Sequence, residues 1–200
     1  MPSPRDRLLA AAIDYVAEHG VGDLSLRRLA AALGTSHRML VYHFGSREGL
    51  LVDVVREVER RQREALAALN RTDLSPTEQA RALWRRLADP ALWPHERLFF
   101  ELYGQALQGR PHAVALLDGV VEAWLGPLTE IITRTGEQPD QARVQARLGV
   151  AVTRGLLLDL LATKDRDGAD AAMELFITWY ERYRGEAGRE RPPQADTPAS

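Results

Sequence analysis

Apolar residues recur at intervals of three and four along almost the whole of this 200-residue sequence, and no stretch alternates between apolar and polar residues. The first spacing matches the 3.6-residue turn of an α-helix, whereas strict alternation is typical of a half-buried strand. The pattern therefore predicts an all-α protein. No run of about 18 apolar residues occurs, so we expect no membrane-spanning helix.

Capping residues divide this pattern into about nine helices, because Ser, Thr and Asp are favoured just before a helix and Gly just after it. The most specific start signal is Ser75-Pro76-Thr77-Glu78, which joins a capping box to a proline at the first helical position. Pro127 is expected to kink or split its segment, since proline lacks the amide hydrogen of the helical bond. The predicted helices cover about residues 4–19, 26–33, 37–44, 47–69, 76–88, 94–109, 111–135, 139–163 and 168–183.

Two domains and a tail are expected. Residues 1–46 hold the first three helices, and residues 47–184 form a larger helical domain, of which residues 47–69 are the connecting helix. The helix over residues 139–163 is apolar nearly all round, which predicts burial on two sides. From Gly185 onward the composition is Gly, Pro, Ala and charge, so residues 185–200 are predicted to be a disordered tail.

The most informative stretch runs from Ser25 to Leu50. Two short helices flank Gly34-Thr35-Ser36, and Gly45 closes the second, which is the layout of a helix-turn-helix. The outer face of the second helix carries no acidic residue, and its side chains can donate hydrogen bonds in a DNA major groove. The candidates for base edges are Ser36, His37, Arg38 and Tyr42; those for phosphates are Ser25, Thr35, His43 and Arg47, with Arg27 and Arg28 as exposed positive charges nearby.

Three motifs stand at fixed spacing here: LSLRRLA at residues 24–30, LGTS at 33–36 and YHFGSREGL at 42–50. With the preceding Ala11-Ala12 and Glu18-His19-Gly20, they resemble the DNA-binding domain of the tetracycline-repressor-like (TetR/AcrR) transcriptional regulators over about the first quarter of the chain. Two positions depart from the family pattern. Arg38 stands where the family often has a small residue, and the usual tyrosine falls one place later, at Tyr42 instead of Val41. We therefore expect groove binding and infer no operator sequence.

The resemblance implies a homodimeric, ligand-responsive repressor that a small-molecule effector releases from a palindromic operator. It also implies a ligand cavity among the middle helices and a dimer interface formed by the last two. The candidate cavity residues are Trp84, Phe99, Tyr103 and Trp124, with Glu101, Gln105 and His112 as polar anchors. The candidate interface residues are Leu148, Val152, Leu156, Leu160, Leu175, Phe176, Trp179 and Tyr183.

The net charge of −2 averages two unlike parts of the chain. Residues 1–63 contain ten arginines and eight acidic residues, a net charge of +2, so the remainder carries −4. Taken alone, the overall value argues against a protein that coats nucleic acid. The small basic excess nevertheless lies in the part of the chain that contains the helix-turn-helix.

Several function classes lack their usual signals. The sequence has no Cys, and its five His residues show no metal-ligand spacing, so we expect neither a metal site nor another cofactor. The N-terminal residues do not form a signal peptide, which predicts a cytoplasmic protein. No catalytic Ser-His-Asp set or glycine-rich phosphate loop stands out, so we expect no enzyme.

One alternative stays open at this point. The chain could be an all-helical small-molecule-binding protein or an enzyme in which the helix-turn-helix is only structural. Such a protein would show no salt-dependent binding to DNA. The acid-free outer face between His37 and His43 favours the DNA-binding interpretation, because a purely structural helix does not need it.

Overall fold

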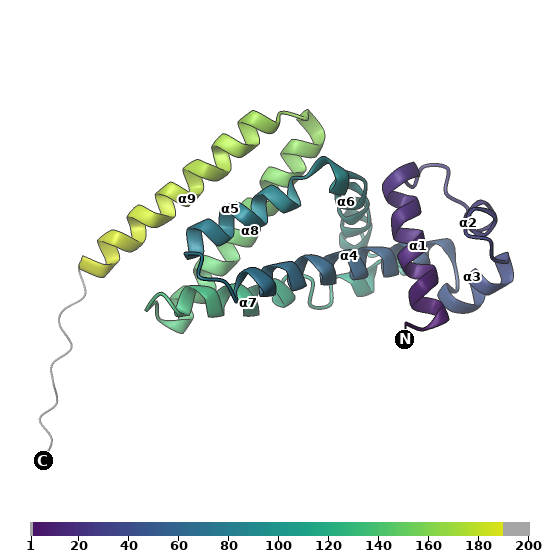
Figure 1. Ribbon diagram of the computed structural model, residues 1–200, viewed down its shortest axis with the longest axis horizontal. Coiled ribbons are helices and arrows are strands. Elements are labelled where there is room, and N and C mark those ends of the chain that lie inside the picture. The colour runs from purple at the N-terminus through teal and green to yellow at the C-terminus, as the bar shows by residue number, and fades with distance from the viewer. Residues whose placement is uncertain (1, 190–200) are drawn as a thin grey trace, which may run out of the picture.

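A computed structural model describes residues 2–189 of the chain, with side chains for residues 2–184. This part is all-helical, as predicted, and contains no helix both long and apolar enough to cross a lipid bilayer. Figure 1 shows α1–α3 gathered at one end of an elongated molecule and α9 at the other. The helices are α1 (Pro4–His19), α2 (Leu26–Ala32), α3 (His37–Phe44), α4 (Arg47–Leu69), α5 (Pro76–Leu87), α6 (Trp93–Leu107), α7 (Glu122–Thr133), α8 (Pro139–Thr163) and α9 (Arg166–Arg189), with short 3-10 helices η1 (Pro90–Leu92) and η2 (Val114–Leu116).

The serines expected to cap helices do so. The side-chain oxygens of Ser25, Ser36 and Ser46 each accept a hydrogen bond from the backbone N–H three residues further on, at 3.0–3.2 Å. Ser75 and Glu78 form the predicted capping box at the start of α5. Local chemistry of this kind explains why the predicted bounds of α1, α3 and α4 are confirmed to the residue.

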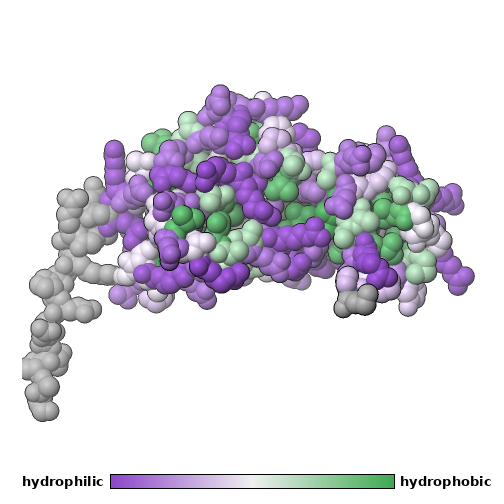
Figure 2. Space-filling model, viewed as in Figure 1, coloured by the Kyte–Doolittle hydropathy of each residue, from purple (hydrophilic) through white to green (hydrophobic). Residues whose placement is uncertain are grey.

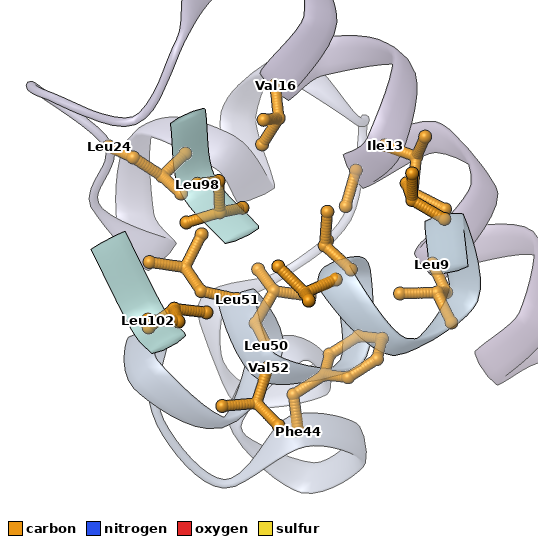
Figure 3. Packing of buried hydrophobic residues seen from close by; sticks show 14 of the residues in the cluster. Leu9, Ile13, Val16, Leu24, Phe44, Leu50, Leu51, Val52, Leu98 and Leu102 are labelled. Carbon is orange, nitrogen blue, oxygen red and sulfur yellow. The ribbon is translucent and has the colours of Figure 1, made fainter. Parts of the chain in front are cut away.

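One hydrophobic core holds α1–α3 together and extends into the rest of the molecule (Figure 3). Side chains from α1, including Leu9 and Ile13, meet Phe44 of α3 and the first turns of α4. Leu98 and Leu102 of α6 pack into the same core. The first three helices are therefore anchored to two helices, α4 and α6, that also belong to the larger domain.

A second core lies among the end of α4 and helices α5, α7, α8 and α9. Leu66 of α4, Leu125 of α7 and Leu160 of α8 are almost completely buried there. Polar residues cover most of the face seen in Figure 2, and apolar residues reach the surface only in patches between them.

The predicted helix over residues 111–135 is wrong in its first half. Residues 110–121 form turns and η2, and α7 begins only at Glu122. Gly119 explains the break, because its φ of 74° lies in the left-handed region, which interrupts a right-handed helix. Pro127 lies inside α7 without ending it. Its missing N–H removes one bond of the helix, and α7 continues to Thr133.

The last helix is longer than predicted at both ends. It begins at Arg166 because the carboxylate of Asp165 accepts a hydrogen bond from the N–H of Gly168 at 2.9 Å. It reaches Arg189, the last described residue, so the first five residues of the tail predicted from Gly185 are helical. Residues 190–200, the rest of the predicted tail, lie outside the described residues.

Candidate nucleic-acid interface and ligand cavity

Local hydrogen bonds build the turn between α2 and α3. The N–H of Thr35 donates to the carbonyl of Ala30 at 2.9 Å. Gly34 adopts a φ of 62°, a conformation in which other residues are strained. Ser36 then accepts the Met39 N–H and begins α3. The helix-turn-helix expected from the sequence is therefore present in the structure.

Helix α3 buries only one of its sides. Leu40 and Phe44 point into the core, whereas 78% of the Tyr42 surface remains exposed. The side chains of His37 and Arg38 make no hydrogen bond or ion pair with any described residue. Sequence reasoning left Met39 and Val41 out, although both are exposed; the full exposed set on α3 is His37, Arg38, Met39, Val41 and Tyr42.

The segment that forms this face carries positive charge and no negative charge. Residues 24–47 contain four arginines and no Asp or Glu. Arg27 and Arg28 are exposed on α2, and Ser25 is exposed at its N-terminus. Because unpaired N–H groups at a helix N-terminus attract anions, the start of α2 adds to the positive potential.

Two of the predicted phosphate contacts have internal roles. The guanidinium of Arg47 donates to the carbonyl oxygens of Leu24 (2.7 Å) and Val21 (2.9 Å), which ties the start of α4 to the loop before α2. The ring of His43 is half-buried, and its Nε2 is enclosed without a hydrogen-bond partner. Arg47 is therefore held by internal hydrogen bonds, and His43 is less accessible than Arg38.

A cavity of about 150 Å³ in the larger domain is lined by residues of α4–α9. Trp84, Phe99 and Trp124, three of the predicted cavity residues, line it. Its remaining walls include Phe100, Leu128, Ile131, Gln145, Thr153, Met173, Phe176 and Tyr180. Most of this lining is apolar or aromatic, as in pockets that take small organic molecules.

The other four predicted cavity residues do not line this cavity. Gln105 donates to Glu101 at 3.2 Å and bonds to His112 at 2.7 Å, in an exposed network. Tyr103 stacks on Phe99 and lies outside the lining. The reason is rotation around α6, which directs Phe99 into the cavity and Glu101 to the surface.

Three charged side chains reach the cavity lining: Glu59 of α4, Glu96 of α6 and Arg154 of α8. Burial raises the pKa of Glu59, although the Trp124 indole donates to its carboxylate at 2.7 Å. Burial, with the negative charge of Glu59 nearby, raises the pKa of Glu96 from 4.5 to about 8. Sequence reasoning missed all three residues, because nothing local marks a carboxylate on a helix as buried.

The predicted dimer-interface residues divide into two groups. Leu175 of α9 is 71% exposed and Trp179 is 60% exposed, and Leu148 and Tyr183 are also exposed. Val152 and Leu156 are half-buried. Leu160 is completely buried within the chain and Phe176 lines the cavity, so neither belongs to an outer face. The inner face of α9 is instead formed by Ala169, Met173 and Ile177.

A sequence model of the family "Bacterial regulatory proteins, tetR family" matches residues 8–54, from α1 into α4. Over these residues the chain is similar to the TetR family. One relative is the HTH-type transcriptional regulator BetI of Stenotrophomonas maltophilia (strain R551-3), which is 31% identical over 84 residues. This match covers 41% of the chain and 42% of the relative, so it spans less than half of either protein.

Solved structures extend the TetR likeness to the whole fold. A transcriptional regulator from Rhodococcus sp. Rha1 superposes with a TM-score of 0.71 at 20% identity, covering 88% of this chain and 95% of that one. A TetR regulator from Legionella pneumophila gives 0.66 at 17%, covering 90% and 98%. A protein of Saccharomonospora viridis, solved in complex with choline, gives 0.69 at 22%, covering 87% and 95%. At such identities the likeness shows the TetR fold alone.

Proposed function

We propose that this chain is a homodimeric, ligand-responsive repressor that binds a palindromic DNA operator and leaves it when a small molecule fills the cavity. The observation that carries the proposal is the exposed, acid-free face of α2 and α3, where His37 and Arg38 have no partner in the described part of the chain. Acting on DNA would place the protein in the cytoplasm.

Helix α3 is the proposed reader of the major groove. Arg38 and His37 have the donors that guanine and other base edges accept, with Ser36 and Tyr42 beside them. Arg27 and Arg28, with Ser25 and Thr35, would hold the phosphates and set the register. We assign Arg47 and His43 chiefly to positioning, because Arg47 is hydrogen-bonded to the loop before α2 and the His43 ring is half-buried.

Dimerisation is proposed through the outer faces of α8 and α9. Leu148, Leu175, Trp179 and Tyr183 leave apolar surface exposed on two neighbouring helices, which is costly in water. Val144 and Leu158, which sequence reasoning missed, are also exposed on α8. A two-fold pairing would cover this surface and place two copies of α3 against the half-sites of a palindrome.

Coupling between the two sites is proposed to run through α4 and α6. The start of α4 packs in the core of α1–α3, and its later residue Glu59 lines the cavity. On α6, Leu98 belongs to the same core, while its neighbour Phe99 contacts the cavity. A ligand that shifts either helix would change the spacing of the two reading heads, by as much as it prefers the shifted state.

A gel-shift series against the DNA upstream of the chain's own gene tests the proposal. We expect specific retardation that weakens steeply as salt concentration rises, because phosphate contacts release counterions. Absence of specific binding to any upstream fragment at low salt would refute it. Turnover of a small molecule in the same preparation would support the alternative, an enzyme with a structural helix-turn-helix.

A further inference from the structure

One of the two carboxyl groups in the cavity lining has no ion pair within the described part of the chain. Its lining contains two carboxyl groups, Glu59 and Glu96, and one guanidinium, Arg154. Arg154 is held in place, since it donates to the carbonyl of Val120 at 2.9 Å and lies over the Phe99 ring at 5.2 Å. Its positive charge lowers the pKa of both carboxyl groups, but it forms an ion pair with neither.

Glu96 is the carboxyl group without a hydrogen bond or ion pair among the described residues. Glu59 accepts a hydrogen bond from the Trp124 indole at 2.7 Å and forms an ion pair with Arg63 at 3.4 Å. Glu96 is only 6% exposed, yet its carboxylate makes no hydrogen bond or ion pair with any described residue. An ionised carboxylate buried in this way is costly to the fold, so Glu96 stays protonated at neutral pH unless a positive charge enters the cavity beside it.

The walls near this carboxyl group present aromatic surface. The indole N–H of Trp84 already donates to Asp170 at 2.6 Å, and that of Trp124 to Glu59. With their donors occupied, both tryptophans can offer a ligand only their carbon surface and π-electrons. Phe99 and Phe100 add two further rings. Aromatic faces beside a carboxylate bind organic cations well and repel anions.

We propose that the effector is a small organic cation of the quaternary or tertiary ammonium class, whose charge pairs with Glu96 among the aromatic side chains of the cavity. The inference rests on the proposed function, since it names the chemistry of the molecule that the repressor would sense. The cation pairs with the ionised carboxylate of Glu96, and its alkyl groups contact the rings.

Such a cation displaces a proton from Glu96. The ionisable groups in the lining are Glu59 from α4, Glu96 from α6, Arg154 from α8 and Tyr180 from α9. The pKa of Tyr180 is raised by burial, so its phenol stays neutral at working pH. With a pKa of about 8 for Glu96, affinity for a permanent cation should rise roughly 90-fold between about pH 6 and about pH 9.

A series of probes with one shape and three charges tests the proposal by calorimetry on the full-length protein. Choline is the cation, neohexyl alcohol carries carbon in place of its charged nitrogen, and tert-butylacetate is the anion. Benzyltrimethylammonium is included as a larger cation. We expect a cation to bind at least about tenfold more tightly than the alcohol, a difference of one cation–π and ion-pair contribution. The proposal would be overturned if the alcohol or the anion bound as tightly as the cations or more tightly, or if neither cation bound.

Two matched variants identify the residue responsible. Glu96→Gln keeps the shape of the side chain and removes its charge, so it should abolish both the cation preference and the pH dependence. Glu101→Gln removes a carboxylate one turn further along the same helix but outside the cavity, and should bind as the wild type does. An unchanged pH profile in Glu96→Gln would assign the effect to another group and refute this one.

Gel shifts run beside the calorimetry separate this inference from the proposed function. If the neutral alcohol released the protein from DNA and the cations did not, the proposed repressor function would stand and only the proposed effector class would be wrong. Loss of all specific DNA binding in the absence of any probe would instead remove the repressor itself, whatever binds the cavity.

Discussion

The buried carboxyl of Glu96 makes a quantitative prediction about stability. Its pKa rises from 4.5 to about 8 on folding, because burial and the nearby Glu59 disfavour the ionised form. Below about pH 4 the Glu96 carboxyl group is protonated in both the folded and the unfolded chain, so its burial costs no stability. As pH rises from there to about 8, the unfolded chain ionises while the folded one does not, so stability falls. Glu96→Gln removes this penalty.

The magnitude follows from the two pKa values. Linkage gives a cost to the native state of about 1 kcal/mol at pH 5, about 3 kcal/mol at pH 7 and about 5 kcal/mol at pH 9. These are upper values, because solvent that enters the cavity would reduce them. Replacement by the neutral amide should therefore gain roughly 4 kcal/mol of stability at pH 9 relative to pH 5. Any pH-independent effect of the amide cancels from that difference.

Urea unfolding of wild type, Glu96→Gln and Glu101→Gln at pH 5, 7 and 9, at one protein concentration, provides the measurement. Glu101 is exposed on the same helix, so its variant should follow the wild-type profile. If wild type and Glu96→Gln lose stability in parallel as pH rises, Glu96 ionises normally in the folded protein and the reasoning fails.

Three further predictions concern the other surfaces. Arg38→Ala should weaken specific DNA binding by about 1–3 kcal/mol in gel shifts and relax specificity; an equal loss on random DNA would mark a phosphate contact instead. Trp179→Glu should yield monomers in light scattering, whereas Leu107→Glu, on the exposed side of α6, should remain dimeric. If both variants remain dimeric, the α8–α9 face is not the dimer interface. Ser75→Ala should lower stability by about 0.5–2 kcal/mol in urea unfolding through loss of the α5 cap, and an unchanged midpoint would contradict this.

Sequence reasoning was most successful where structure depends on neighbours along the chain. Ser36 and Ser46 cap α3 and α4 as expected, because the bond that begins a helix joins residues three apart. It failed where a single backbone conformation decided the outcome. Gly119 breaks the segment before α7, and a glycine does not reveal from sequence whether it will turn the chain or remain in a helix.

The sequence by itself determined the helical class, the helix-turn-helix and the acid-free face that carries Arg38. Only the tertiary structure decided the cavity and the outer faces. Glu59 and Glu96 come from different helices and meet because α4 and α6 pack on one another, which no periodicity expresses. Likewise Leu160 is buried and Leu175 exposed, although both occupy apolar positions. Burial depends on what lies opposite a side chain, and that is settled by the packing of segments distant in sequence.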